Sequence, residues 1–211
     1  MSLDYYSMLT QYGNIYPLSV KIDDCKSLVK WTEENFEYVK YNPRKDINRW
    51  GLSITSLHGG LDGVPDLDSL LEYNRENNTE YKETDFTAKT PVAEHPDIKK
   101  ILEPFEGEYH RAHLLRLDQG GFFPPHRDLR KTHFRSFRII IPLQNVNAPD
   151  FNFILEDKII NWELGRMYFV DTAKMHYLFN CSIDNPSYWI VLNINTNQNT
   201  INTVTSSFLH K

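Results

Sequence analysis

The feature that most limits the possible folds of this chain is a two-residue alternation in segments that begin near residue 108. From residue 137 to 143 every second side chain is apolar, and these are Phe137, Ile139, Ile141 and Leu143. Successive side chains of a strand point to opposite faces, so this face packs against other elements while Arg138 points the other way. Further strands are expected over residues 109–117, 151–155, 158–162, 167–170 and 187–195. Many short strands after a helical start predict an α+β chain with a jelly-roll core.

The first half of the chain predicts helices and one strand. A helix is expected from Asp23 to about Tyr38, capped by Asp23 or Asp24, with shorter helices over 67–73 and 96–102 and a strand over 49–57. Residues 74–94 are polar and weakly patterned, which indicates a flap, and the polar tail is expected to cross the surface. At 211 residues we expect one domain, with an N-terminal part (1–106), a jelly-roll core (107–196) and a polar tail (197–211).

Composition narrows the class of protein. A hydrophobic content of 40% with 24% charged residues is typical of a soluble globular protein, and a net charge of −5 gives no footprint for nucleic acid. Basic residues gather locally near Asp118 and Asp128, which suggests a pocket for carboxylates; they are Arg127, Arg130, Lys131, Arg135 and Arg138.

The cysteines and the N-terminus bear on the compartment. Cys25 and Cys181 form neither a disulfide framework nor a Cys-x-x-Cys pair, which agrees with a reducing environment. The start of the chain has no basic and apolar signal pattern, and no apolar run approaches the ~18 residues that span a bilayer. We therefore expect a cytoplasmic protein without a membrane contact.

The segment FFPPHRDL places His126 and Asp128 two residues apart, and His176 follows in a later strand-like segment. A His-x-Asp pair on an extended stretch puts both side chains on one face. Two imidazoles and one carboxylate cover one face of an octahedral metal and leave the opposite positions open, as in non-heme Fe(II) oxygenases. Gly120-Gly121 allow a tight turn before the pair, and Pro124-Pro125 stiffen the approach to it.

The letters His-x-Asp also occur where no metal is bound. Eight histidines in the chain make a chance His-x-Asp unremarkable on its own. The same letters open a protein-kinase catalytic loop, but His133 stands where that loop needs asparagine. The chain also has no glycine-rich phosphate loop and no Asp-Phe-Gly, which excludes a kinase.

The surroundings of the three residues resemble a known family. Arg138-Ile-Ile-Ile-Pro-Leu follows the pair, and Gly165-Arg-Met-Tyr-Phe-Val-Asp171 precedes His176. From about His110 to Asn195 these segments resemble the double-stranded β-helix of 2-oxoglutarate-dependent oxygenases. They are most similar to the aspartyl/asparaginyl β-hydroxylase branch, which includes free-proline hydroxylases.

That resemblance implies Fe(II) held by His126, Asp128 and His176, with 2-oxoglutarate as co-substrate and O₂ as oxidant. It implies hydroxylation of a free amino acid or a peptidyl side chain, on a substrate that carries a carboxylate. No catalytic residue beyond the metal ligands is expected. The oligomeric state is not predicted.

The resemblance also suggests residues for the two organic ligands. Arg138 is expected to bind a carboxylate of either the co-substrate or the substrate, because arginine offers a bidentate fork. The family's usual arginine about ten residues after the second histidine is missing from Asn185–Leu192. We therefore assign to the co-substrate Arg138, His113, Asn180 and Tyr188, and to the substrate Arg130 and Trp50.

Two alternatives stay open for a chain with this pattern. One is a jelly-roll metal-binding protein that has lost the co-substrate. The other is a cupin-type metalloenzyme, an isomerase or a dioxygenase, that needs no keto acid. Succinate formation separates them, since only a 2-oxoglutarate oxygenase produces it.

Overall fold

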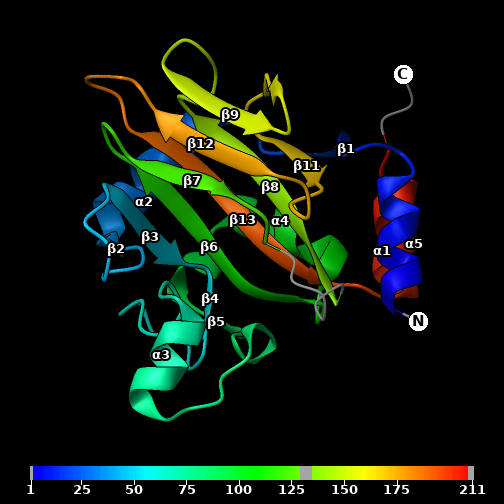
Figure 1. The fold of residues 1–211 in the computed structure, drawn as a ribbon, viewed down its shortest axis with the longest axis horizontal. Helices are drawn as coiled ribbons and strands as arrows, with labels where there is room; N and C mark the ends of the chain where they lie inside the picture. Colours follow the sequence, from blue (N-terminus) through cyan, green and yellow to red (C-terminus); the bar gives the residue numbers. More distant parts are fainter. Residues whose placement is uncertain (1, 129–134, 209–211) are drawn as a thin grey trace.

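Two antiparallel sheets face each other and form the body of the molecule (Figure 1). The computed structural model describes residues 2–128 and 135–208. Within them the larger sheet has the strand order β1 (Ile15–Lys21), β11 (Arg166–Val170), β8 (Ser136–Gln144), β13 (Ser187–Asn195), β6 (Tyr109–Leu117), β3 (Arg49–Ser53), β2 (Val39–Lys40). The smaller sheet has the order β10 (Lys158–Ile159), β9 (Phe151–Leu155), β12 (His176–Asn180), β7 (Phe122–His126). Two short strands, β4 (Thr55–Ser56) and β5 (Ala88–Lys89), form a separate pair.

Strand β8 shows why the larger sheet is apolar on both faces. Its odd residues, including Ile139 and Ile141, belong to the core between the sheet and the helices. Ile140 points the other way, into the space between the two sheets, where it joins Leu115 and Trp189. The predicted alternation is confirmed, and with it the α+β class and the jelly-roll core.

Helices cover the outer face and one end of the larger sheet. They are α1 (Ser2–Thr10), α2 (Cys25–Asn35), α3 (Leu70–Asn77), α4 (Pro96–Leu102) and α5 (Gln198–Ser206), with 3-10 turns at Glu83–Asp85, Pro91–Glu94 and Glu103–Phe105. Helix α2 begins where Asp24 accepts the backbone N–H of Ser27 at 3.0 Å, and it buries Leu28 and Val29. No helix in the described parts of the chain has both the length and the apolarity to cross a membrane.

The C-terminal segment differs from the surface tail expected from its polar composition. Residues 198–206 form α5, which lies beside α1 at one end of the molecule (Figure 1). Ile201 and Val204 are buried and lie three residues apart, on one face of the helix, while the polar faces stay in water. Asn197 starts the helix by accepting the backbone N–H of Thr200 at 3.0 Å.

Two further segments also differ from expectation. The N-terminal strand β1, which the sequence pattern does not predict, pairs with β11 and extends the larger sheet. The expected flap at 74–94 contains the end of α3, two 3-10 turns and β5. This segment packs through the buried side chains Phe86, Val92 and Ala93.

A close backbone turn leads from β6 into β7 and sets the position of His126. Gly120 has a φ of +70°, and the N–H of Gly121 donates to Asp118 O at 2.8 Å. A Cβ at Gly121 would collide with the carbonyl oxygen of Asn48, so a larger residue would displace the turn. The glycine pair therefore makes the tight turn that its sequence predicts.

Candidate metal centre and active site

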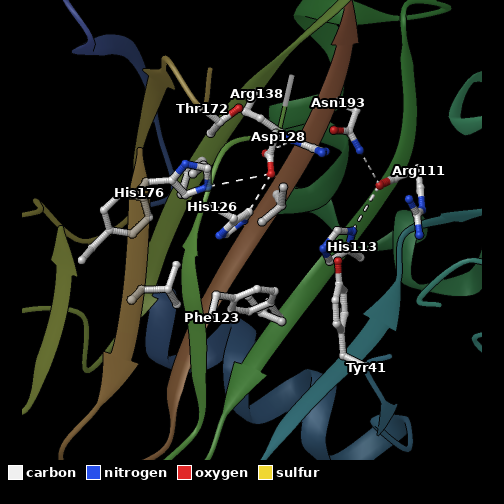
Figure 2. A pocket seen from close by; sticks show the side chains of 15 residues that line it. Tyr41, Arg111, His113, Phe123, His126, Asp128, Arg138, Thr172, His176 and Asn193 are labelled. Carbon is white, nitrogen blue, oxygen red and sulfur yellow. Dashed lines mark hydrogen bonds and ion pairs between the residues drawn. The ribbon is translucent and has the colours of Figure 1, made fainter. Parts of the chain in front are cut away.

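His126, Asp128 and His176 come together between the two sheets (Figure 2). His126 ends β7, His176 begins β12, and the two residues are direct cross-strand partners. One donor atom from each of the three side chains lies within 4.8 Å of the other two. Nε2 of His126 is 3.3 Å, and Nε2 of His176 3.8 Å, from Oδ1 of Asp128. This is the donor set of a non-heme iron site.

The other nitrogen of each imidazole is held by a backbone carbonyl. Nδ1 of His126 lies 2.7 Å from the carbonyl of Pro124, and Nδ1 of His176 lies 3.0 Å from that of Lys174. A carbonyl can only accept, so the proton of each neutral ring is on Nδ1 and the lone pair of Nε2 faces Asp128. In this neutral form, Nε2 of each ring is available to bind a divalent metal.

Asp128 is charged because its surroundings favour the carboxylate. Burial alone would raise the pKa of Asp128, but the Arg138 guanidinium and the two imidazoles hold that pKa well below its usual value. Nε of Arg138 donates to Oδ2 of Asp128 at 3.0 Å. Burial lowers the pKa of His176, whereas Asp128 outweighs burial at His126 and raises that pKa.

A cavity of about 130 Å³ adjoins the three residues. Its polar lining near the metal ligands comprises Arg111, His113, Arg138, Thr172 and Asn193, and its apolar lining includes Tyr41, Leu115, Phe123, Ile140, Phe153 and Leu178. Burial lowers the pKa of His113 to about 3, so this imidazole is neutral at ordinary pH. A neutral imidazole and two guanidinium groups therefore share the cavity with the donor set.

The start of β13 carries aromatic side chains instead of a cation. Trp189 is buried there and packs against Trp162 and Phe153, with ring centroids 5.3 and 6.0 Å away. Its indole N–H donates to Oγ of Ser187 at 2.7 Å. An anionic group that needs a positive partner has to find it elsewhere in the barrel.

Two of the residues assigned to the co-substrate, Arg138 and His113, do line the cavity. Two others do not. Tyr188 points to the outer face of the sheet, where its hydroxyl donates to the Glu33 carboxylate of α2. Asn180 binds backbone at the strand ends, with its amide donating to Leu117 O at 2.9 Å and to Asn185 O at 3.0 Å.

The sequence assigns two residues, Trp50 and Arg130, to the substrate. Trp50 also faces outward, because it alternates with the inward-facing Arg49 and Gly51 on β3, and its indole packs against the outer core. Arg130 lies outside the described residues. In place of Trp50 the structure brings Tyr41, Arg111 and Asn193 to the cavity.

For two of these three residues, the alternation of side chains along a strand would have indicated from the sequence that they face the cavity. Arg111 shares the inward face of β6 with His113 and Leu115, and Asn193 shares that of β13 with Val191. Tyr41 follows a two-residue strand, so no periodic pattern marks it.

Comparison with known proteins agrees with this geometry. The family model for aspartyl/asparaginyl beta-hydroxylase matches residues 69–194. No curated protein sequence shows significant similarity to the chain.

Solved structures share the fold. A prolyl-4-hydroxylase from Pseudomonas putida has 11% identity and a TM-score of 0.51, over 93% of this chain and 100% of the other. HygX from Streptomyces hygroscopicus, solved with nickel and 2-oxoglutarate bound, has 9% identity and a TM-score of 0.52, over 92% and 87%. The non-heme alpha ketoglutarate dependent epimerase SnoN has 10% identity and a TM-score of 0.51, over 91% and 81%.

The likeness to these structures establishes the fold, whereas the family model covers more than half of the chain and includes all three metal-ligand candidates. The chain belongs to the aspartyl/asparaginyl β-hydroxylase family, and it is accordingly a 2-oxoglutarate-dependent oxygenase that uses Fe(II).

Proposed function

We propose that this protein hydroxylates a free amino acid or a peptidyl side chain that carries a carboxylate, with Fe(II) held by His126, Asp128 and His176. The observation that carries the proposal is the convergence of one donor atom from each residue within 4.8 Å, with Nε2 of both imidazoles facing Oδ1 of Asp128. The bound iron would supply the dioxygen chemistry. The chain's own residues hold the ligands, orient the substrate and keep water out of the cavity.

Arg138 is proposed to bind the substrate carboxylate. Its Nε is already engaged with Asp128, at 3.0 Å, so the guanidinium sits directly beside the metal ligands. The remote carboxylate of a chelated 2-oxoglutarate lies farther out, since its chain extends about 5 Å from one carboxyl carbon to the other. The guanidinium's two terminal nitrogens are better placed for a substrate held over the metal.

Arg111 is less suited to that role because each of its three guanidinium nitrogens already has a partner in the protein. It donates to the backbone oxygens of Asp66 and Asp68 and forms an ion pair of 2.9 Å with Glu83. We assign it to holding the segment around Glu83 against the barrel, on one wall of the substrate space.

The test is the stoichiometric conversion of 2-oxoglutarate to succinate. Purified protein with Fe(II), 2-oxoglutarate and O₂ is expected to form succinate slowly alone, and faster with an accepted substrate. Free amino acids and short peptides are then screened by mass spectrometry for the gain of one oxygen atom. Protein that binds iron but never forms succinate would contradict the proposal.

Asp128→Ala and Asp157→Ala are the matched variants for this assay. Asp157 is exposed beyond β9, so its loss should leave succinate formation unchanged. Asp128→Ala removes the carboxylate from the donor set and should abolish it.

A further inference from the structure

Among the residues that the structure describes, one buried cation inside the barrel has no carboxylate partner. Arg49, on β3, is 3% exposed, and its Nε forms no hydrogen bond. Burial lowers the pKa of its guanidinium, which means that the fold leaves a positive charge in a poorly solvated position. Burying such a charge costs folding free energy unless a counter-ion pairs with it.

The other partly buried arginines of the described residues all have carboxylate partners. Arg111 pairs with Glu83, Arg138 with Asp128, Arg116 with Asp118, and Arg166 with Glu163. Arg49 is the exception in this part of the chain. Its neighbours are two aromatic rings, with its guanidinium carbon 4.2 Å from the ring centre of Phe123 and 5.6 Å from that of Tyr41.

These two rings connect Arg49 to the active-site cavity. Phe123 and Tyr41 both line it, as Figure 2 shows below the metal ligands. Phe123 also stacks near the imidazole of His126, with ring centroids 6.1 Å apart. The ring of Phe123 is therefore a neighbour of both the Arg49 guanidinium and a candidate metal ligand.

The register of the larger sheet places Arg49 at the end where β13 begins. Arg49 pairs with Leu117, and Leu117 pairs with Ser187 on its other side. All three share the inward face, at the level where Trp189 and Ser187 supply no positive charge.

We infer that Arg49 binds the remote carboxylate of 2-oxoglutarate, reached past the edges of Phe123 and Tyr41. This inference rests on the proposed function, since it concerns the co-substrate of the same site. Five carbons extend about 5 Å between carboxyl carbons, which suits a ligand that starts at the metal and passes one aromatic ring. The guanidinium offers a bidentate partner for that carboxylate, and the carboxylate supplies the missing counter-ion.

The experiment compares 2-oxoglutarate with 2-oxopentanoate, which chelates a metal in the same way but ends in a methyl group. Binding of each acid to Fe(II)-loaded protein is measured by calorimetry under nitrogen, so the readout does not depend on turnover. Wild-type protein is expected to prefer 2-oxoglutarate. Arg49→Met is expected to weaken 2-oxoglutarate binding about 30-fold or more and to leave 2-oxopentanoate binding unchanged.

Two further variants serve as controls. Arg116→Met removes a cation from the outer face of the neighbouring strand and should keep the wild-type preference. Arg49→Lys keeps the charge but not the fork, so it should weaken 2-oxoglutarate binding selectively and to a smaller degree; it also serves if Arg49→Met does not fold. A second readout is thermal unfolding, in which 2-oxoglutarate should stabilise wild-type protein more than Arg49→Met.

The outcomes separate the two proposals. If wild-type protein prefers 2-oxoglutarate and the Arg49 variants keep the full preference, the assignment of Arg49 is overturned while the oxygenase function stands. If wild-type protein binds neither acid in the presence of Fe(II), the proposed function fails and the inference fails with it.

Discussion

Nε of Arg138 lies 3.0 Å from Oδ2 of Asp128, so the carboxylate that faces the two histidines is held from behind by a guanidinium. This contact leaves Oδ1 directed to both imidazoles, at 3.3 and 3.8 Å. The contact links strand β8 to the segment after β7. Arg138 therefore helps to hold the Asp128 carboxylate in place beside the two histidines.

Removing Arg138 should destabilise the metal-free protein. Arg138→Met leaves a largely buried carboxylate without its cation, which costs about 1–3 kcal/mol in the free energy of unfolding. Urea denaturation in the presence of a chelator measures it. In the double variant Arg138→Met with Asp128→Asn the charge on both sides is gone, and most of the loss should be restored; equal stability of Arg138→Met and wild type would contradict the role of the pair.

Metal binding should stabilise the fold through Asp128. At a free Mn(II) concentration of about 100 times its dissociation constant, wild-type protein should gain roughly 2.7 kcal/mol in unfolding free energy. Asp128→Ala should lose nearly all of this gain, whereas Asp157→Ala should retain it. Thermal unfolding with and without Mn(II) provides the measurement, and an equal gain in Asp128→Ala would place the metal elsewhere.

Stability should fall in mild acid because of His113. Burial lowers the pKa of this imidazole from 6.5 to about 3. Below pH 6.5 the imidazole of His113 therefore binds a proton in the unfolded chain but not in the folded chain. The free energy of unfolding decreases as the pH falls. Between pH 7 and 4.5 this single group costs about 2–3 kcal/mol.

His113→Gln is expected to reduce the loss of stability between pH 7 and 4.5 by that amount, as measured by urea denaturation at both values. The other histidines are the same in both proteins, so the difference isolates His113. His58→Gln, at an exposed side chain, should keep the wild-type dependence. An unchanged pH dependence in His113→Gln would show that the imidazole is protonated in the folded state.

Asn180 should act on stability and not on the co-substrate. Its side chain links Leu117 O, Asn185 O and the N–H of Ser182 at the end of β12. Asn180→Ala should therefore lower the free energy of unfolding by about 1–3 kcal/mol, because buried backbone groups lose their partner. The affinity for 2-oxoglutarate should not change, with the exposed Asn161→Ala as control.

Alternation and spacing are sufficient to predict the jelly roll and the clustering of three candidate metal ligands. The two faces of β8 are distinct in the printed sequence, and β9 and β13 begin and end where their patterns do. His126 and Asp128 share a short segment, so one more histidine at the start of a neighbouring strand completes the set.

What could not be predicted depends on contacts across the sheets. Residue type alone assigns Tyr188 and Trp50 to the ligands, but their strand neighbours decide which face each occupies, and both lie outside the barrel. Arg49 carries no motif, and only the pairing of β3 with β6 turns it inward. Helix α5 escapes prediction because its apolar residues are few, and their burial comes from packing on the rest of the fold.

The pairing of Arg138 with Asp128 also bears on the order in which ligands assemble. With both imidazoles neutral, as metal binding requires, the guanidinium and the carboxylate cancel and the chain's four groups carry no net charge. The whole double charge of a bound divalent ion is then left to attract a dianion such as 2-oxoglutarate. Metal-free protein offers the dianion only the single charge of Arg49 in place of the metal's double charge, so association should be sequential, with the cation entering first.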